Sequence, residues 1–460
     1  MSQLQHESSD GLDPDFALGR SRVDRIVAAV EDQDSAELDH LLEPLHSADI
    51  ADMLEQISEP QRRALLQLWK GGMEGEILSD LDEGLRSEVI RDLAPEELAE
   101  AVRDLETDDV VDLIEDLDGD QQGAVLRALE ASDRVAVEDS LSYPEDSAGR
   151  LMQRECVMVP EHWNVGQAIE HLRARDDLPD QFYHLILVDA RLHPTGYVTL
   201  GKLLASHRQV KLQDIAEESF RTILATQDEE DVAYAFNQYH LISAPVVDEA
   251  GRLVGVITID DAMEVLDDEA EEDIMRLAGV GEGSLTDRVL STVKRRFPWL
   301  FVNLVTAILA SAVIAQFDQV IASFVALAVL MPIVASMGGN AGTQSLTVAV
   351  RALATKDLTS ANVWRVVRRE AFVGLINGMV FAIVMGAVGL MWFGIPMLGV
   401  VIALAMVLNL LVAGLAGVLI PLGLEKLGID PALASGAFVT TVTDVVGFFA
   451  FLGLAAGLLL

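Results

Sequence analysis

Five long apolar stretches fill the chain after Arg296, and they limit its fold more than any other feature. Each exceeds the about 20 residues that a helix needs to cross about 30 Å of hydrocarbon. Buried helices of water-soluble proteins are rarely so long and so free of charge. The sequence therefore predicts five transmembrane helices. The stretches are Phe297–Phe317, Ile321–Val350, Ala371–Phe393, Leu398–Leu424 and Ala432–Leu460.

Cationic residues beside these stretches predict the topology, because Lys and Arg concentrate in cytoplasmic loops. They occur before the first stretch and in the second and fourth loops, whereas the first and third loops have none. We therefore expect a multi-pass protein of the inner or plasma membrane, with a cytoplasmic N-terminus and the C-terminus outside. The residues are Lys294, Arg295, Arg296, Arg351, Lys356, Arg365, Arg368, Arg369 and Lys426.

Charge divides the chain into two unlike halves. Residues 1–290 carry 23 Lys and Arg against 67 Asp and Glu, whereas residues 291–460 carry 9 against 6. The first half is therefore strongly acidic, and it repels nucleic acid and attracts cations. We expect no nucleic-acid partner. The single cysteine, Cys156, excludes a disulfide within the chain.

One ionisable residue, Asp444, lies inside the fifth stretch. A carboxylate at that depth costs on the order of 3 kcal/mol on insertion scales and marks a candidate functional site. No Lys or Arg lies inside any of the five stretches, so a permeating cation is a simpler partner than a structural counter-charge. Thr440 and Thr441 precede Asp444 by four and three residues, so they share its helix face and could hold its oxygens or bound water.

The second stretch contains Pro332 and three glycines between Gly338 and Gly342. These residues predict a broken or loosened helix. The freed carbonyls, with the amides of Asn340 and Gln344, would offer oxygen ligands for a hard cation. Close helix packing through glycine is the alternative. Two further amides, at positions 377 and 409, are explained equally well by hydrogen bonds between helices.

The ligand chemistry of the stretches favours Mg²⁺, Ca²⁺ or Mn²⁺ over a soft metal, because they contain no His or Cys. One carboxylate per chain is too few for a dehydrated Mg²⁺ site, and Mg²⁺ loses its water reluctantly. Two copies of Asp444 around a hydrated ion fit better, so we expect a homodimer in the lipid bilayer.

The acidic half divides into further regions. Residues 1–19 are expected to be disordered, and residues 20–140 contain short amphipathic helices that recur every 11–17 residues, as in a helical solenoid. Residues 141–208 and 209–266 repeat one order: strand, helix, strand, turn, strand, helix. Residues 267–293 form a connecting helix to the membrane domain, residues 294–460. Nine carboxylates crowd Asp260–Asp273.

The repeated order resembles the tandem CBS-domain pair, a regulatory module that often binds adenine nucleotides. In that family a Thr or Ser followed three residues later by Asp holds ribose. The second unit keeps this pattern as Thr258 and Asp261, whereas the first has Thr199 followed by Lys202. The resemblance therefore implies an α+β pair and ATP as a candidate ligand at Thr258 and Asp261.

The whole chain resembles the MgtE family of magnesium channels. An acidic helical region, a CBS pair and five spans occur in that order, with P-x-x-x-x-x-G-G-N-x-G-x-Q at Pro332–Gln344 and T-D-V-V-G around Asp444. The resemblance implies a homodimeric channel that imports Mg²⁺ through one pore at the subunit interface. It places the ion on Asp444 of both chains, with Asn340 nearby and Glu370 near the pore mouth.

The resemblance also implies regulation by cytosolic Mg²⁺. The connecting helix corresponds to the plug helix of the family, and Mg²⁺ that bridges carboxylates of the N-terminal, CBS and plug regions closes the pore. The candidate regulatory ligands are Asp108, Asp112, Asp228, Asp260, Asp261, Asp267 and Glu269.

We therefore predict a multidomain protein in which a helical N domain and an α+β CBS pair precede an all-α, five-helix membrane domain. Two alternatives stay open: a transporter or exchanger of another divalent cation such as Co²⁺ or Mn²⁺, and a membrane-anchored nucleotide sensor. An enzyme is not expected, since the sequence has no nucleophile–base pair and no phosphate-binding glycine loop followed by lysine.

Overall fold

The computed structural model describes residues 18–460 except residues 71, 104, 116, 118, 176–177, 180, 218–219, 281–288 and 360. The chain forms two compact units, Met1–Asp267 and Asp268–Leu460, and each is described by itself. Nearly all of the segment predicted to be disordered, residues 1–19, lies outside the described residues, as does part of residues 267–293.

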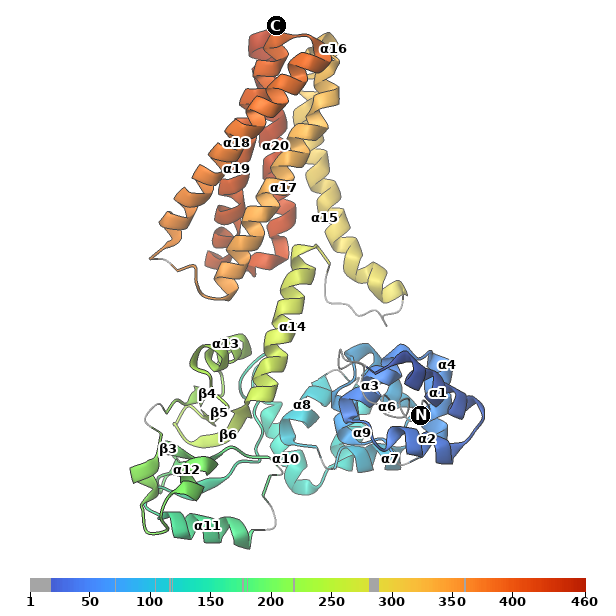
Figure 1. Cartoon of the computed structure of the whole chain (residues 1–460), viewed down its shortest axis with the longest axis vertical. Coiled ribbons are helices and arrows are strands. Elements are labelled where there is room, and N and C mark those ends of the chain that lie inside the picture. The colour runs from blue at the N-terminus through green and yellow to red at the C-terminus, as the bar shows by residue number, and fades with distance from the viewer. Residues whose placement is uncertain are drawn as a thin grey trace, which may run out of the picture. The chain divides into compact units, whose positions relative to one another are not determined.

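Short amphipathic helices form the first part of the N-terminal unit (Figure 1), which confirms the helical N domain. Their apolar sides meet in one core, where Ile26, Leu38 and Met53 are fully buried. Asp34 shows how such short helices begin: its carboxylate accepts a hydrogen bond from the N–H of Glu37 and so satisfies a free donor. The helices are α1 (Arg20–Glu31), α2 (Ser35–Leu42), α3 (Ser47–Gln56), α4 (Glu59–Leu68), α5 (Gly75–Ser79), α6 (Glu83–Asp92), α7 (Pro95–Ala101), α8 (Thr107–Glu115), α9 (Gly119–Ala128) and α10 (Ala131–Ser140).

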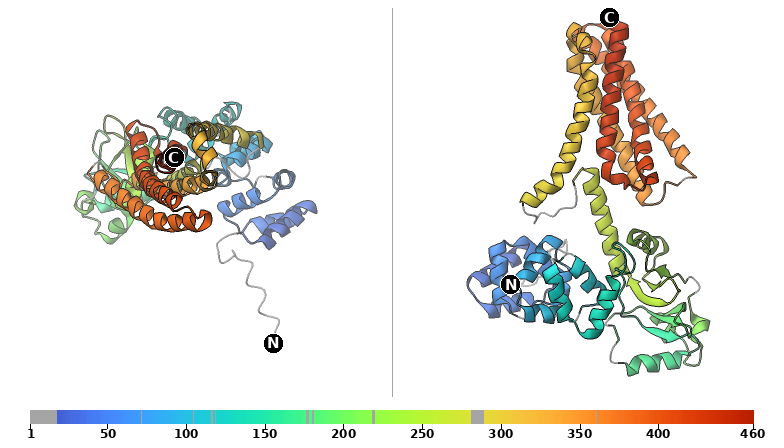
Figure 2. Two further views of the ribbon diagram at one scale, coloured as in Figure 1. Left: turned by 90° about the horizontal axis from the view of Figure 1, so that it is seen from above. Right: turned by 180° about the vertical axis from the view of Figure 1, so that it is seen from behind.

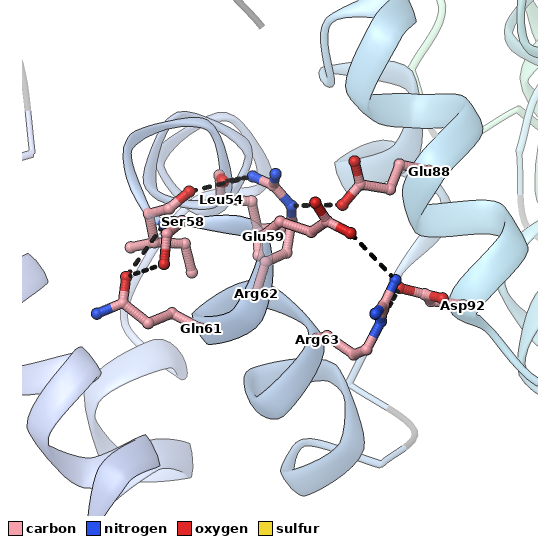
Figure 3. Close-up of polar contacts among 9 residues, drawn as sticks. Leu54, Ser58, Glu59, Gln61, Arg62, Arg63, Glu88 and Asp92 are labelled. Atoms are coloured by element: carbon pink, nitrogen blue, oxygen red, sulfur yellow. Dashed lines mark hydrogen bonds and ion pairs between the residues drawn. The ribbon is translucent and has the colours of Figure 1, made fainter. Parts of the chain in front are cut away.

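Two adjacent arginines of α4 join it to its neighbours (Figure 3). The Arg62 side chain is buried, donates to the Leu54 carbonyl of α3 and lies 3.6 Å from the Glu88 carboxylate of α6. The Arg63 guanidinium pairs with Asp92, also of α6, at 2.8 Å. A buried guanidinium is tolerated when it is paired and hydrogen-bonded, so Arg62 fixes the stacking of these helices.

Two small sheets of identical topology follow, which confirms the CBS pair. In each, the first strand pairs parallel with the second and the second antiparallel with the third. Both sheets also shift register at the end of the middle strand, after Leu187 and after Val246. The elements are β1 (Met158–Pro160), α11 (Val165–Ala174), β2 (His184–Val188), β3 (Pro194–Thr199), α12 (Leu200–Ala205), η1 (Leu212–Ile215), β4 (Ile223–Leu224), α13 (Glu229–Tyr239), β5 (Ser243–Val247), β6 (Leu253–Thr258) and α14 (Ile259–Leu277).

Five helices within the described residues are long and apolar enough to cross a membrane, as predicted. Among them α19 is central, because it packs against α17, α18 and α20, whereas α15 packs chiefly along α20 (Figure 2). The helices of this unit are α15 (Val289–Ala315), α16 (Asp318–Ser323), α17 (Ala326–Ala354), α18 (Val363–Phe393), α19 (Pro396–Lys426) and α20 (Pro431–Leu459).

Glycines bring the spans into close backbone contact. A Cβ built on Gly374 of α18 would lie 2.5 Å from the Leu410 carbonyl oxygen of α19. A Cβ on Gly414 of α19 would lie 2.8 Å from the Glu370 carbonyl oxygen of α18. Real Cβ atoms do not approach so closely, so only glycine fits at either position. The α18–α19 spacing is therefore set by glycine.

The predicted break in the second span is wrong. Helix α17 continues through Pro332 and through the glycines at 338, 339 and 342. These glycines instead provide close contacts: a Cβ on Gly342 would lie 2.6 Å from the Val439 side chain of α20. The structure therefore agrees with the alternative drawn from the sequence, in which these glycines allow close packing of the helices.

Candidate ion pathway and acidic cluster

Asp444 lies near the middle of α20 and is half-buried. Among the described residues, none donates a hydrogen bond to its carboxylate and no cationic group pairs with it. The Thr440 and Thr441 hydroxyls, predicted to support it, donate to carbonyls of their own helix, at 2.9 Å to Gly436 and 2.6 Å to Ala437. The carboxylate therefore has the free coordination that an ion site requires.

Helix α17 packs against α20 beside this carboxylate. A Cβ built on Gly339 would lie 3.9 Å from the Thr440 methyl group, one helical turn before Asp444. Asn340, the next residue of α17, is exposed, and its amide nitrogen lies 3.5 Å from the Ser336 hydroxyl. The packing brings the Asn340 and Asp444 segments of the two helices together.

Four exposed polar residues follow one face of α17, and we refer to them as the α17 polar stripe: Ser336, Asn340, Thr343 and Thr347. Their spacing of four, three and four residues repeats along one side of a helix. The amide of Asn340 cannot face hydrocarbon cheaply. This side of α17 therefore requires water or another polar surface.

Asn409 of α19 joins three spans. It is fully buried, and its amide nitrogen donates to the Val334 carbonyl of α17 at 2.8 Å. Its amide also fills the space beside two glycines: a Cβ on Gly338 would lie 2.2 Å from Nδ2, and one on Gly447 of α20 would lie 2.9 Å from it. Its Oδ1 has no hydrogen-bond partner among the described residues.

Glu370, the third predicted pore ligand, lies in a cavity whose described lining comes from α17, α18 and α19. The Ser345 hydroxyl of α17 donates to its carboxylate at 2.9 Å. None of the described residues that line this cavity belongs to α20, so the structure does not bring Glu370 to the same wall as Asp444.

The C-terminal part of α14 contacts the ends of two spans within the membrane unit. Arg276 pairs with Asp430, the residue whose carboxylate caps the N-terminus of α20. The next residue, Leu277, packs with Leu346 of α17 and Ala432 of α20. This end of α14 is therefore fixed to both helices that flank the Asn340–Asp444 region.

Four carboxylates meet in the N-terminal unit, and we refer to them as the acidic cluster: Glu106, Asp108, Asp109 and Asp261. Burial and the charges of Glu155, Asp109 and Asp261 raise the pKa of Glu106 to about 7. Burial, then Asp261 and Asp112, raise the pKa of Asp109 to about 7 as well. Burial and Asp261 raise the pKa of Asp108, which is 8% exposed, well above its usual range.

No Lys or Arg among the described residues forms an ion pair with the acidic cluster. Burial also raises the pKa of Asp261, although the hydroxyl and N–H of Thr258 donate to its carboxylate at 2.7 and 3.1 Å. Where these carboxyl groups ionise, the cluster is a concentration of negative charge without a positive partner among the described residues. A cation would relieve this repulsion.

Polar contacts hold the start of α8 against the CBS pair beside the cluster. The Thr107 hydroxyl donates to Glu155 at 2.6 Å, and the Gln153 amide donates to Glu106. The repulsion within the cluster therefore acts directly on the junction of the N domain and the CBS pair.

The other predicted regulatory carboxylates are outside the acidic cluster as defined, although the charge of Asp112 raises the pKa of Asp109 and that of Asp260 raises the pKa of Asp261. Asp112 pairs with Arg86 at 2.7 Å, and Asp228 caps α13 by accepting from the N–H of Glu230. Asp260 is exposed and accepts from the Thr258 hydroxyl. Along α14, residue Asp267 is exposed and Glu269 half-buried.

The structure thus joins two of the predicted regulatory residues, Asp108 and Asp261, and adds Glu106 and Asp109, which sequence reasoning missed. The sequence contained an indication of both, because they lie within two residues of Asp108 at the start of one helix. Within the described part of the chain, no three His, Cys, Asp or Glu side chains already have the arrangement of a metal site.

Three family profiles match successive parts of the chain. The MgtE intracellular N domain matches residues 45–146, the CBS domain matches residues 148–207 and 212–268, and the MgtE divalent cation transporter domain matches residues 331–454. The magnesium transporter MgtE of Thermus thermophilus is 34% identical over 94% of this chain and 97% of its own. The chain belongs to the MgtE family. The magnesium transporter MgtE of Bacillus subtilis is 33% identical over 72% of this chain and 73% of its own.

A solved structure is also similar to part of this MgtE-family chain. The cytosolic domain of the Mg²⁺ channel MgtE in complex with ATP is 28% identical, covers 53% of this chain and 99% of that one, and has a TM-score of 0.49. The family matches confirm the resemblance drawn from the sequence motifs, and the relatives are named as transporters rather than enzymes.

Proposed function

We propose that the chain conducts Mg²⁺ through a pore formed by a homodimer, with Asp444 of both copies around one hydrated ion. The observation that carries this proposal is the Asp444 carboxylate in the middle of α20, which has no partner among the described residues. The names of the relatives from Thermus thermophilus and Bacillus subtilis support Mg²⁺ as the ion.

The chemistry of Mg²⁺ favours a shared site. Mg²⁺ demands six oxygen ligands and gives up its water reluctantly, so a single carboxylate per chain suits contact through the hydration shell. A second copy would provide a second Asp444. It would also cover the exposed α17 polar stripe, including Asn340, with protein or with the water of the pore.

The charge pattern supports the orientation proposed for the pore. The acidic N-terminal unit lies in the cytoplasm and the C-terminus outside, in the cell membrane, because the Lys and Arg flanks alternate in that sense. An inside-negative membrane potential then drives Mg²⁺ inward, and the function is import.

The acidic cluster supports closure by cytosolic Mg²⁺. Without Mg²⁺ its carboxylates repel one another across the junction of α8 and the CBS pair. Mg²⁺ neutralises them and favours the compact state, and α14 transmits the change to α17 and α20 through Arg276 and Leu277. Changing the ratio of closed to open channels from 1:99 to 99:1 needs about 5.5 kcal/mol of differential binding of Mg²⁺ to the closed state, and several weak sites would share it.

The decisive experiment measures Mg²⁺ influx into liposomes that contain the full chain or its Asp444→Asn variant. We expect influx to fall at least about tenfold, because removing a charge that the ion contacts costs more than about 1.4 kcal/mol. The control is Asp357→Asn, the same change at an exposed loop carboxylate. Unchanged influx in Asp444→Asn would overturn the pore assignment, and competition by Co²⁺ or Mn²⁺ would measure selectivity.

ATP binding at Thr258 and Asp261 stays a prediction. In the structure these residues are hydrogen-bonded to each other, and Asp261 belongs to the acidic cluster. A nucleotide must therefore replace that bond, and its phosphates must avoid the cluster. Calorimetric titration of the full chain with ATP, compared with Asp261→Asn, tests the prediction.

A further inference from the structure

The first two turns of α18 carry three arginines, Arg365, Arg368 and Arg369, which we refer to as the α18 cationic patch. Their spacing of three and four residues places them on one side of the helix. All three are exposed, whereas Val367 and Glu370 lie on the other side of α18 and are buried. The patch therefore faces outward, away from the helices against which α18 packs.

The arginines of the patch have no acidic partner in the part of the chain that the structure describes, since none of them forms an ion pair there. The nearest carboxylates in sequence, Asp357 and Glu370, instead accept hydrogen bonds from neutral hydroxyl groups at 3.0 and 2.9 Å. Like charges three and four residues apart on a helix repel each other. The patch is thus a local excess of positive charge, and a bound anion would relieve the repulsion.

The outward side of α18 becomes apolar directly after the patch. Phe372, Ile376 and Ile383 follow Arg368 at successive intervals of four, four and seven residues, so they continue the same side. Their exposed fractions are 64%, 55% and 76%. Because α18 packs chiefly against α19 and lies at the edge of the membrane unit (Figure 1), this apolar surface is available to lipid chains.

Two exposed tryptophans indicate how deep the patch lies in the bilayer. Trp364 and Trp392, near the two ends of α18, are 68% and 63% exposed, and tryptophan is enriched at both membrane interfaces. They are 28 residues apart, which is about 42 Å of helix and matches the about 40–45 Å of a bilayer with its headgroups. The patch begins directly after Trp364 and ends about 8 Å further along the helix axis, so it lies in the headgroup layer.

We propose that the α18 cationic patch binds the phosphate groups of anionic phospholipids. Guanidinium groups match phosphate oxygens with paired N–H donors, and the apolar surface below them accommodates the acyl chains. Each arginine near an anionic membrane surface contributes about fivefold to the attraction, so three would give a preference of about 100-fold over a zwitterionic lipid, whose ammonium group opposes binding.

The carboxylates of the acidic N-terminal unit are the other anions that this chain offers. They have no apolar part to cover Phe372 and Ile376, whereas a phospholipid has both a charged head and apolar chains. The charge and the adjoining apolar surface together therefore favour lipid. This inference does not depend on the proposed transport of Mg²⁺.

Native mass spectrometry of the full chain released from nanodiscs tests the inference. The nanodiscs contain phosphatidylglycerol and phosphatidylcholine in equal amounts, with distinguishable masses. We expect the unsubstituted chain to retain phosphatidylglycerol in excess. The combined variant Arg365→Gln, Arg368→Gln, Arg369→Gln should retain at least about one phosphatidylglycerol fewer per chain, because the charges that hold the phosphate are gone.

The matched control removes the same charge from exposed sites of the N-terminal unit, as Arg91→Gln, Arg127→Gln, Arg191→Gln, and should leave the retained lipid unchanged. If the combined α18 variant does not fold, Arg368→Gln alone should retain an intermediate number of phosphatidylglycerol molecules. Equal retention of the two lipids by the unsubstituted chain would overturn the inference. So would undiminished phosphatidylglycerol in the α18 variants, the result expected if carboxylates of the N-terminal unit occupied the patch instead.

Discussion

Adding one methyl group at Gly338 should push α17 away from α19, because the Asn409 amide already fills that space. The new Cβ would lie 2.2 Å from Nδ2 and 2.8 Å from Cγ of Asn409. Asn409 cannot easily move, since it is fully buried and its Nδ2 is bound to the Val334 carbonyl. Overpacking of this kind costs about 1–3 kcal/mol, and losing the interhelical hydrogen bond about 0.6 kcal/mol more.

Gly338→Ala should therefore destabilise the membrane unit by about 2–3 kcal/mol, measured by reversible unfolding in mixed detergent micelles. Asn409→Ala alone should cost about 1 kcal/mol or less, because the lost hydrogen bond is offset by removal of the unpaired Oδ1. In the double variant the new methyl group enters the space that the amide leaves. The double variant should therefore be destabilised by at least about 1 kcal/mol less than the sum of the two single variants.

Gly453→Ala is the matched control, because among the described residues no atom outside the surrounding backbone of α20 lies within 4 Å of a Cβ built there. It should leave stability unchanged or raise it slightly through better helix propensity. If Gly338→Ala behaved like Gly453→Ala, or if the costs of Gly338→Ala and Asn409→Ala added within about 0.5 kcal/mol, the contact would not be as tight as described.

Three further predictions concern the two units. The pKa values of Glu106 and Asp109 are raised to about 7, so the N-terminal unit should lose stability in Mg²⁺-free buffer as the pH rises from about 4 to 7. Mg²⁺ should then protect this unit from protease better at pH 8 than at pH 6. Equal protection at the two pH values would refute this prediction. Arg276→Ala should raise Mg²⁺ influx at high cytosolic Mg²⁺, since α14 loses its ion pair with Asp430, and unchanged closure would contradict the coupling. Arg62→Ala should cost about 3 kcal/mol and speed hydrogen exchange in α3 and α4, whereas Arg63→Ala, at an exposed pair, should cost under about 1 kcal/mol.

The sequence predicted the elements whose physics is local. Length and apolarity were enough to predict the five spans, and the repeated order of strands and helices was enough to predict the two sheets. Both patterns depend only on residues that are close in sequence. Asp444 could likewise be selected from its own span, since a lone carboxylate there needs no knowledge of its neighbours to be unusual.

Features that depend on neighbouring elements could not be predicted in this way. Pro332 and the glycines after it predict a helix break, but the side chains that pack against these glycines belong to α19 and α20, more than 60 residues away in sequence. The raised pKa values of Glu106 and Asp109 arise first from burial, and the charge of Asp261, which lies in a different domain of the sequence, raises both further. The contrast between Asp108 and Asp112 has the same origin, because only the structure shows that Arg86 neutralises Asp112.

Uncompensated negative charge occurs in both units, but its density differs in a way that matters for the proposed function. Burial raises the pKa of all four carboxyls of the acidic cluster, and the charge of Asp261 raises that of the other three further, so a cation bound there gains from several charges at once. Asp444 provides one carboxylate per chain, and a pore site must release its ion as readily as it binds it. A sensor must instead stay occupied long enough to hold the closed state. The clustered carboxylates of the N-terminal unit therefore suit retention of an ion. The single carboxylate of the membrane unit suits passage of the same ion.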